Sequence, residues 1–144
     1  METISDYLSA DHQRCDTLFA DAEAAAAANQ LGPAQAGFTA FRQGMLHHLA
    51  MEETVLFPAF EQASGSSMGP TRMMRMEHEQ MRELFAQMDD ALAAGNTRTF
   101  AGLAETLLIL MQQHNLKEEQ ILYPMTDRAL QNTEEIIRQM DAVA

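Results

Sequence analysis

The chain contains no tryptophan, one cysteine, and nine basic residues against 21 acidic ones among its 144 residues. Because the single cysteine, Cys15, has no internal partner, a small fold held together by disulfide bonds is excluded. The formal net charge of −12 argues against a nucleic-acid partner, since phosphate binding needs clustered Lys and Arg. The same charge disfavours binding to an anionic membrane surface.

Long hydrophobic runs are missing as well. No segment approaches the length of about 20 apolar residues that spans a bilayer. Residues 1–25 lack the basic segment and apolar run that are typical of a secretory signal. We therefore expect a cytoplasmic protein without a membrane partner. The apolar content of 47% is enough for a hydrophobic core, and the length predicts a single domain over residues 1–144.

The hydrophobic pattern is helical throughout, with apolar residues recurring every three or four positions. Gly32-Pro33, the linker 64–70 and Gly95-Asn96 interrupt it. The pattern predicts helices at about 4–30, 33–61, 70–94 and 97–128, and a short terminal helix at about 133–142. Short connections make neighbouring helices antiparallel, so the predicted fold is all-α, an up-down-up-down four-helix bundle with a short C-terminal helix. The segment after Arg128 either caps this bundle or provides a homodimer contact.

A repeat divides the chain into two halves of the same design. The residues His12, His48 and Glu52 each recur 66 residues later, as His78, His114 and Glu118. The surrounding sequences align too, since segment 48–58 matches segment 114–124 and both end in proline. Each of these prolines is expected to kink or end its helix. The repeat predicts two similar helix hairpins related by a rough two-fold axis.

The repeated residues are expected to meet inside the bundle. Residues four positions apart lie about 40° apart around a helix, so His48 and Glu52 face the same way. The corresponding residues of the second half do likewise, and the two lone histidines enter from the first and third helices. Burying imidazoles and carboxylates without partners costs free energy. The alternative is that these residues are remnants of a lost site buried in the core, but that explains less well why one polar arrangement appears twice in register. The sequence therefore predicts a two-metal site with the ligands His12, His48, Glu52, His78, His114 and Glu118.

The ligand types narrow the choice of metal. Imidazole mixed with carboxylate, without thiolate, suits iron, manganese or zinc. If both glutamates bridge the ions, and a solvent-derived oxo or hydroxo group adds a further donor, one position on each ion stays open. A redox-active ion with an open position binds or activates a diatomic ligand or peroxide, which favours two iron ions. Ferritin-like di-iron sites use Glu-x-x-His, whereas the order and the spacing are reversed here.

At these six residues the chain resembles the hemerythrin-like, or HHE cation-binding, family over about residues 5–128. The resemblance implies a non-haem di-iron centre, bridged by Glu52 and Glu118, that handles oxygen, nitric oxide or peroxide in sensing, detoxification or a stress response. The oxygen-carrying hemerythrins have another histidine where this chain has Arg82. Their last ligand motif is His-x-x-x-x-Asp, where this chain has His114-x-x-x-Glu118. The spacing here is closer to that of the di-iron proteins that repair iron–sulfur clusters.

A second function fits the same residues. A module that stores, senses or delivers iron without turnover needs the same ligands, and the sequence does not separate an enzyme from such a module. Turnover with peroxide or nitric oxide distinguishes the first function, and ready release and reloading of metal distinguishes the second.

Residues near the ligands have further roles to test. Asp16 and Arg82 hold equivalent positions in the repeat, each four residues after a lone ligand histidine. We expect both near the site, either paired across the cavity mouth, where they gate or polarise the open position, or, for Asp16, as a seventh ligand. The alternative is that both side chains simply reach solvent. Cys15 lies one helical turn from His12. It is either a redox thiol or a core residue like Met81, its counterpart in the repeat.

Two further acidic residues, Glu53 and Glu119, are repeated directly after the glutamate ligands. One helical position rotates a side chain by about 100°, which turns both away from the ligand face. The pattern favours solvated charges over hydrogen-bond acceptors for the ligand imidazoles.

Overall fold

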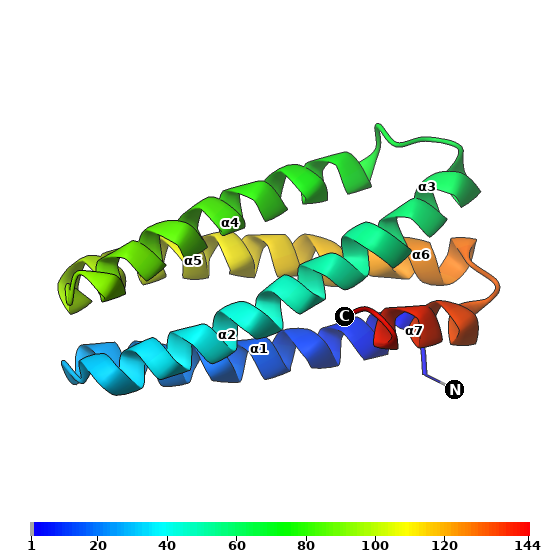
Figure 1. Ribbon diagram of the computed structural model, residues 1–144. Coiled ribbons are helices and arrows are strands. Elements are labelled where there is room, and N and C mark those ends of the chain that lie inside the picture. The colour runs from blue at the N-terminus through cyan, green and yellow to red at the C-terminus, as the bar shows by residue number, and fades with distance from the viewer. Residues whose placement is uncertain (1) are drawn as a thin grey trace.

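The computed structural model describes residues 2–144 and is helical along most of that length. Its elements are α1 (Ile4–Ala27), α2 (Leu31–Met51), η1 (Glu52–Leu56), α3 (Phe57–Ser64), α4 (Pro70–Ala93), α5 (Thr97–Lys117), η2 (Glu118–Leu122), α6 (Tyr123–Ala129) and α7 (Thr133–Asp141). The elements α2, η1 and α3 form one continuous rod, as do α5, η2 and α6, so four long rods run alternately up and down (Figure 1). The predicted all-α bundle with a short C-terminal helix is confirmed.

Local sequence sets the ends of the rods. The Oγ1 of Thr3 accepts a hydrogen bond from the amide of Asp6, and the Asp6 carboxylate accepts one from the amide of Thr3. This capping box starts α1. Gly65 and Gly95 have φ angles of 75° and 71°, a left-handed conformation that glycine adopts without steric cost at the ends of α3 and α4. The linker predicted from the glycine- and serine-rich segment therefore joins α3 to α4.

The two η elements are π-helical turns at matching places in the repeat. In η1 the amide of Phe57 donates to the carbonyl of Glu52, five residues back, and in η2 the amide of Tyr123 donates to the carbonyl of Glu118. Pro58 and Pro124 follow directly, and a proline lacks the amide and clashes with the preceding turn of an α-helix. The rods therefore continue through a wider turn, where the sequence predicted a kink or an end.

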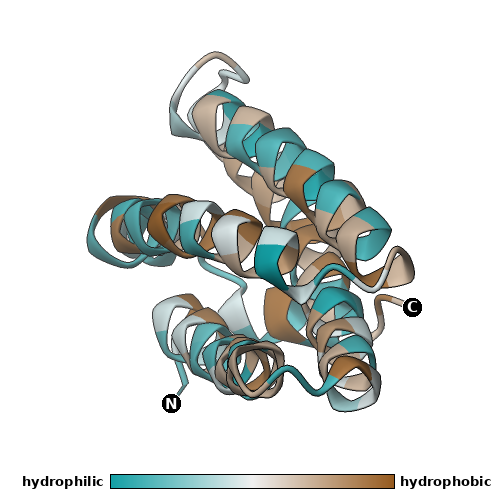
Figure 2. Ribbon diagram, turned by 90° about the vertical axis from the view of Figure 1, so that its left-hand side faces the viewer, coloured by the Kyte–Doolittle hydropathy of each residue, from teal (hydrophilic) through white to brown (hydrophobic). Residues whose placement is uncertain are grey.

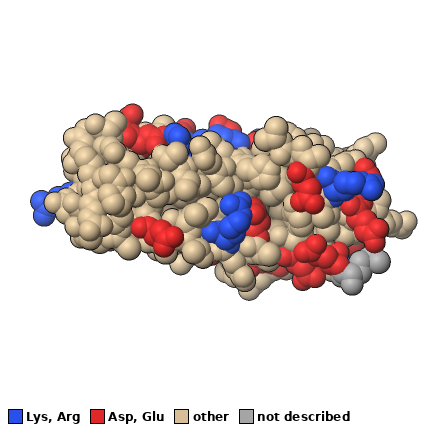
Figure 3. All heavy atoms as spheres, turned by 60° about the horizontal axis from the view of Figure 1, so that its bottom comes forward, with Lys and Arg blue, Asp and Glu red and all other residues tan. Residues whose placement is uncertain are grey.

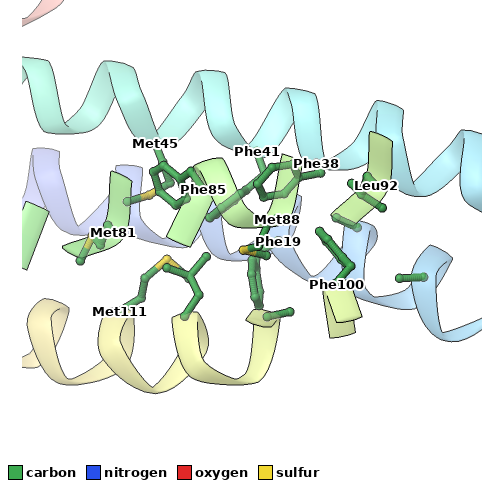
Figure 4. Packing of buried hydrophobic residues seen from close by; sticks show 14 of the residues in the cluster. Phe19, Phe38, Phe41, Met45, Met81, Phe85, Met88, Leu92, Phe100 and Met111 are labelled. Carbon is green, nitrogen blue, oxygen red and sulfur yellow. The ribbon is translucent and has the colours of Figure 1, made fainter. Parts of the chain in front are cut away.

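Hydrophobic side chains form two clusters along the bundle. The larger lies among α1, α2, α4 and α5 and contains Phe19, Phe38, Phe41, Phe85 and Phe100 (Figure 4). The Phe41 ring meets those of Phe19 and Phe85 edge to face, with centroids 5.0 Å and 5.8 Å apart. Each rod carries hydrophilic and hydrophobic residues, as amphipathic helices do (Figure 2).

The smaller cluster closes the other end of the bundle. Ile136 and Met140 of α7 pack there with Ile4, Leu8 and Phe57, so α7 caps this end. Along the chain, each predicted ligand histidine lies between residues of one cluster and residues of the other. These buried histidines therefore form a polar layer between the two clusters. The fold thus places the predicted ligands at one level of the interior.

Two glycines of α2 let it approach α1 closely. A Cβ on Gly37 would lie 3.2 Å from the Cα of Ala22, and one on Gly44 would lie 3.1 Å from the Arg14 guanidinium. On the face seen in Figure 3, basic side chains are interspersed with acidic ones, and acidic groups gather toward the end that carries α3 and α7. Within residues 2–144, no helix has both the length and the apolar character needed to cross a membrane.

Candidate metal centre

Each of the six predicted ligands comes from a different element of the four rods. All six are buried, with between 0 and 3% of their surface exposed. Their side chains form two groups of four, and in each group one ligand atom per residue lies within 4.8 Å of the others. The groups are His12, His48, Glu52 and Glu118, and Glu52, His78, His114 and Glu118. The two groups share both glutamates, which is the arrangement that two bridged ions require.

Carboxylates hold the outer nitrogen of every ligand histidine. The distances from Nδ1 to the carboxylate oxygen are 2.6 Å for one pair and 2.8 Å for three. The pairs are His12 with Glu119, His48 with Asp11, His78 with Glu53, and His114 with Glu77. An Nδ1–H that donates to a carboxylate leaves Nε2 free to face the interior as a metal ligand. The contacts obey the repeat, so both halves orient their imidazoles alike.

The prediction for Glu53 and Glu119 as solvated charges was therefore wrong. Glu53 accepts from His78 on α4, and Glu119 accepts from His12 on α1. Both glutamates face a neighbouring helix as well as solvent. The prediction considered only the rotation around their own helix, and that rotation does not show which side chains a neighbouring helix presents. Their repetition in register was the feature that favoured the correct role.

Three of the four supporting carboxylates also bind a cation. Asp11 pairs with Arg14 at 2.9 Å, Glu77 pairs with Lys117, and Glu53 accepts from both terminal nitrogens of Arg82 at 2.9 and 2.7 Å. These cations offset the negative charge that would otherwise gather around the imidazoles.

The buried charges shift one another's pKa values. Burial opposes a charge on His48, but the carboxylates of Glu52 and Asp11 outweigh burial and raise its pKa from 6.5 to about 10. Burial likewise opposes a charge on His78, yet Glu52 and Glu53 raise its pKa to about 9. The pKa of Glu52 lies well below its usual value despite burial, chiefly because of His48. A metal ion that binds here must therefore displace protons from His48 and His78.

The donor atoms fit a metal. Among the described residues, Oε1 of Glu52, Nε2 of His78, Nε2 of His114 and Oε2 of Glu118 are buried without a hydrogen-bond partner. Nε2 of His78 and Oε1 of Glu52 lie 3.1 Å apart without the alignment of a hydrogen bond. Buried polar atoms left unpaired cost about 1–3 kcal/mol each, and a bound cation would satisfy all four. These atoms are the imidazole and carboxylate donors that iron accepts.

Tyr123, the first residue of α6, is a member of the centre that the sequence analysis missed. Its hydroxyl donates to Oε2 of Glu52 at 2.5 Å and lies 3.0 Å from Oε1 of Glu118. The same oxygen lies 3.2 Å from Nε2 of His12 and 3.5 Å from Nε2 of His48. Burial, then the carboxylates of Glu118 and Glu52, raise the pKa of this phenol well above 10.0. The repeat contained the clue, since Leu-Tyr-Pro in the second half stands against Leu-Phe-Pro in the first.

Asp16 and Arg82, which were expected to gate the site, do not form a salt bridge with each other. Arg82 donates to Glu53 and to Glu79, so it supports His78 through Glu53 instead of pairing with Asp16. Asp16 is exposed and belongs to neither ligand group. The predicted pairing of Asp16 with Arg82 is therefore not formed, because Arg82 makes its salt bridges with Glu53 and Glu79. Cys15 packs in the larger hydrophobic cluster, where burial raises the pKa of its thiol to about 12.

Comparison with known proteins bears on this centre. The family model described as Hemerythrin HHE cation binding domain matches residues 3–126, which include all six ligands and Tyr123. The chain has no significant match among curated proteins or among solved structures. The match and the clustered donors together make this a metal-binding centre.

Proposed function

The chain belongs to the hemerythrin HHE cation-binding family, and on that basis we propose that it is a non-haem di-iron protein that binds or reacts with oxygen, nitric oxide or peroxide. The observation that carries the proposal is the sharing of Glu52 and Glu118 by the two ligand groups. A single ion would need only one group, whereas two ions held side by side need carboxylates that reach both.

The burial of the centre supports a small ligand. Every ligand residue is at most 3% exposed, so a molecule that reaches the ions must be small enough to pass between packed helices. Oxygen, nitric oxide and peroxide meet that condition. Burial also favours a resident metal over a delivered one, because release would require the ligand layer between two hydrophobic clusters to open.

The chemistry divides between the metal and the chain. Iron, when bound, supplies redox change and an open coordination position. The chain supplies the imidazoles in one orientation, fixed by their contacts with Asp11, Glu53, Glu77 and Glu119. Glu52 and Glu118 balance part of the cationic charge, and the surrounding clusters exclude bulk water from the centre.

The optical spectrum of the iron-loaded chain tests this proposal. The reduced protein is mixed separately with oxygen, nitric oxide and peroxide, and we expect a spectral change with at least one of them. The change should disappear in His48→Ala, which removes a ligand. It should persist in His47→Ala, whose imidazole contacts the Val143 carbonyl and belongs to neither group. An iron-loaded protein that responds to none of the three would contradict the proposal and support iron storage or delivery.

A further inference from the structure

The repeat mates Tyr123 and Phe57 give the two halves of the centre different chemistry. The Tyr123 ring stacks on His12 with centroids 5.6 Å apart, and the Phe57 ring stacks on His78 at 5.5 Å. The interplanar angles are also alike, at 27° and 26°. The rings therefore occupy equivalent places, and the tyrosine adds one oxygen atom to one half.

That oxygen lies among the donors of a single ligand group. Its distances of 2.5, 3.0, 3.2 and 3.5 Å reach Glu52, Glu118, His12 and His48, which together make up the first group. In octahedral coordination with bonds of about 2.1 Å, neighbouring donor atoms lie about 3.0 Å apart. The hydroxyl is thus placed where a fifth donor to the same ion would be, next to all four of the others.

The second half has no equivalent oxygen. Its side chains include both unpartnered imidazole nitrogens, on His78 and His114, and the two unpartnered carboxylate oxygens of Glu52 and Glu118. Phe57 covers His78 with ring carbon, which cannot bind a cation as a donor ligand. In the His12–His48 half, the Tyr123 oxygen takes up one more coordination position. The His78–His114 half keeps that position free for an incoming ligand.

We propose that Tyr123 contributes its phenolic oxygen as a ligand in the His12–His48 half, and that the small exogenous ligand binds in the His78–His114 half. The inference rests on the proposed di-iron function and assigns the open position within it. When the oxygen–metal bond forms, the O–H bond breaks and the proton leaves to solvent, as protons do when a metal ion binds protonated ligands. The Tyr123 oxygen then bears the negative charge that the metal ion neutralises.

The electronic spectrum of the oxidised, iron-loaded chain tests the assignment. A phenolate bound to iron(III) gives a visible charge-transfer band, with tyrosine vibrations enhanced in the resonance Raman spectrum. We expect both in the wild-type chain and neither in Tyr123→Phe, with the iron content unchanged. The chain has a matched control in its other tyrosine, because Tyr7 contacts Asp141 outside the centre and Tyr7→Phe should keep the band.

Azide, a small anion, probes the open position. Tyr123→Phe should gain a second azide site, because it frees a position in the His12–His48 half. Phe57→Tyr should strengthen the charge-transfer band and weaken azide binding by tenfold or more, since it places a second phenol beside His78. Circular dichroism and the iron content of each variant show that it is folded and loaded.

The same measurements distinguish a failure of the Tyr123 assignment from a failure of the di-iron proposal. Iron bound without a tyrosine-derived band, or a band that survives in Tyr123→Phe, overturns the inference and leaves the di-iron proposal standing. A chain that does not take up iron overturns both.

Discussion

Asp11 accepts a hydrogen bond from Nδ1 of His48 at 2.8 Å, and its repeat mate Glu77 accepts one from Nδ1 of His114 at the same distance. Each carboxylate stands directly before a lone ligand histidine in the sequence and reaches the histidine of the adjacent rod. The contact fixes the imidazole ring and aims Nε2 at the metal position. The repeat therefore encodes the orientation of the ligands as well as their identity.

Replacing this acceptor should weaken metal binding. We expect Asp11→Ala to lower iron affinity by about 10–100-fold, because His48 loses the contact that holds its ring and its tautomer. Asp16→Ala is the control, since Asp16 lies on the same helix, is exposed and belongs to neither ligand group. Competition with a chelator measures both affinities. Equal affinities for the two variants would show that the Asp11 contact does not support the site.

The stability of the metal-free protein should be greatest in mildly acidic solution. The charged forms of His48 and His78 stabilise the fold fully below their ordinary pKa of 6.5, and that contribution is lost as the pH rises through about 9–10. Asp11 and Glu53, whose pKa values are lowered to about 2, contribute above their ordinary values of 3.8 and 4.5 and lose that contribution as the pH falls through about 2.

Urea unfolding of chelator-treated protein across the pH range measures this dependence. The midpoint should be highest between about pH 4.5 and 6.5 and should fall on either side. A midpoint that rises between pH 7 and 9 would contradict the assigned pKa shifts, because it would mean that the folded state prefers neutral imidazoles.

The close approach of α1 and α2 should make one glycine hard to replace. Gly37→Ala places a Cβ 3.2 Å from the backbone of Ala22, and we expect a loss of about 1 kcal/mol or more in the free energy of unfolding. Gly102 lies in α5 with nothing within 4 Å of an added Cβ, so Gly102→Ala should gain about 0.5–1 kcal/mol from helix propensity. Thermal unfolding compares the pair. If both substitutions stabilise the protein, the packing argument for α1 and α2 fails.

The sequence predicted the bundle because the helices show in local hydrophobic patterns and the pairing of the two halves shows in the repeat. Hydrophobic periodicity locates each helix without knowledge of its neighbours. The repeat adds a long-range constraint, since two copies of one polar arrangement are expected to lie at one level of a two-fold bundle. That is why the six residues could be predicted as ligands from the sequence, and the structure brings their side chains together in two groups.

Tyr123 escaped prediction because the helix changes pitch just before it. Tyr123 follows Glu118 by five positions, which in an α-helix is a rotation of about 140° and points the two side chains apart. The π turn of η2 instead bonds the Tyr123 amide to the Glu118 carbonyl, so the two residues lie one above the other. A proline in the next position of both halves is the sequence feature that marks this turn.

The expected pair of Asp16 and Arg82 failed for a different reason. Equivalent positions in a repeat share a direction, but the sequence does not tell which neighbour each side chain meets. Glu53, on the adjacent rod, lies within 2.7 Å of Arg82 and binds it. Contacts between rods depend on side-chain reach and on rod spacing, and neither is visible in a periodic pattern.

The central claim is that two ions share Glu52 and Glu118, and counting iron in protein purified under iron-replete conditions tests it most directly. We expect about two iron ions per chain, and a loss of both in Glu118→Ala, because that carboxylate belongs to both ligand groups. A wild-type chain with one ion or none, or a Glu118→Ala variant that keeps both ions, would contradict the claim.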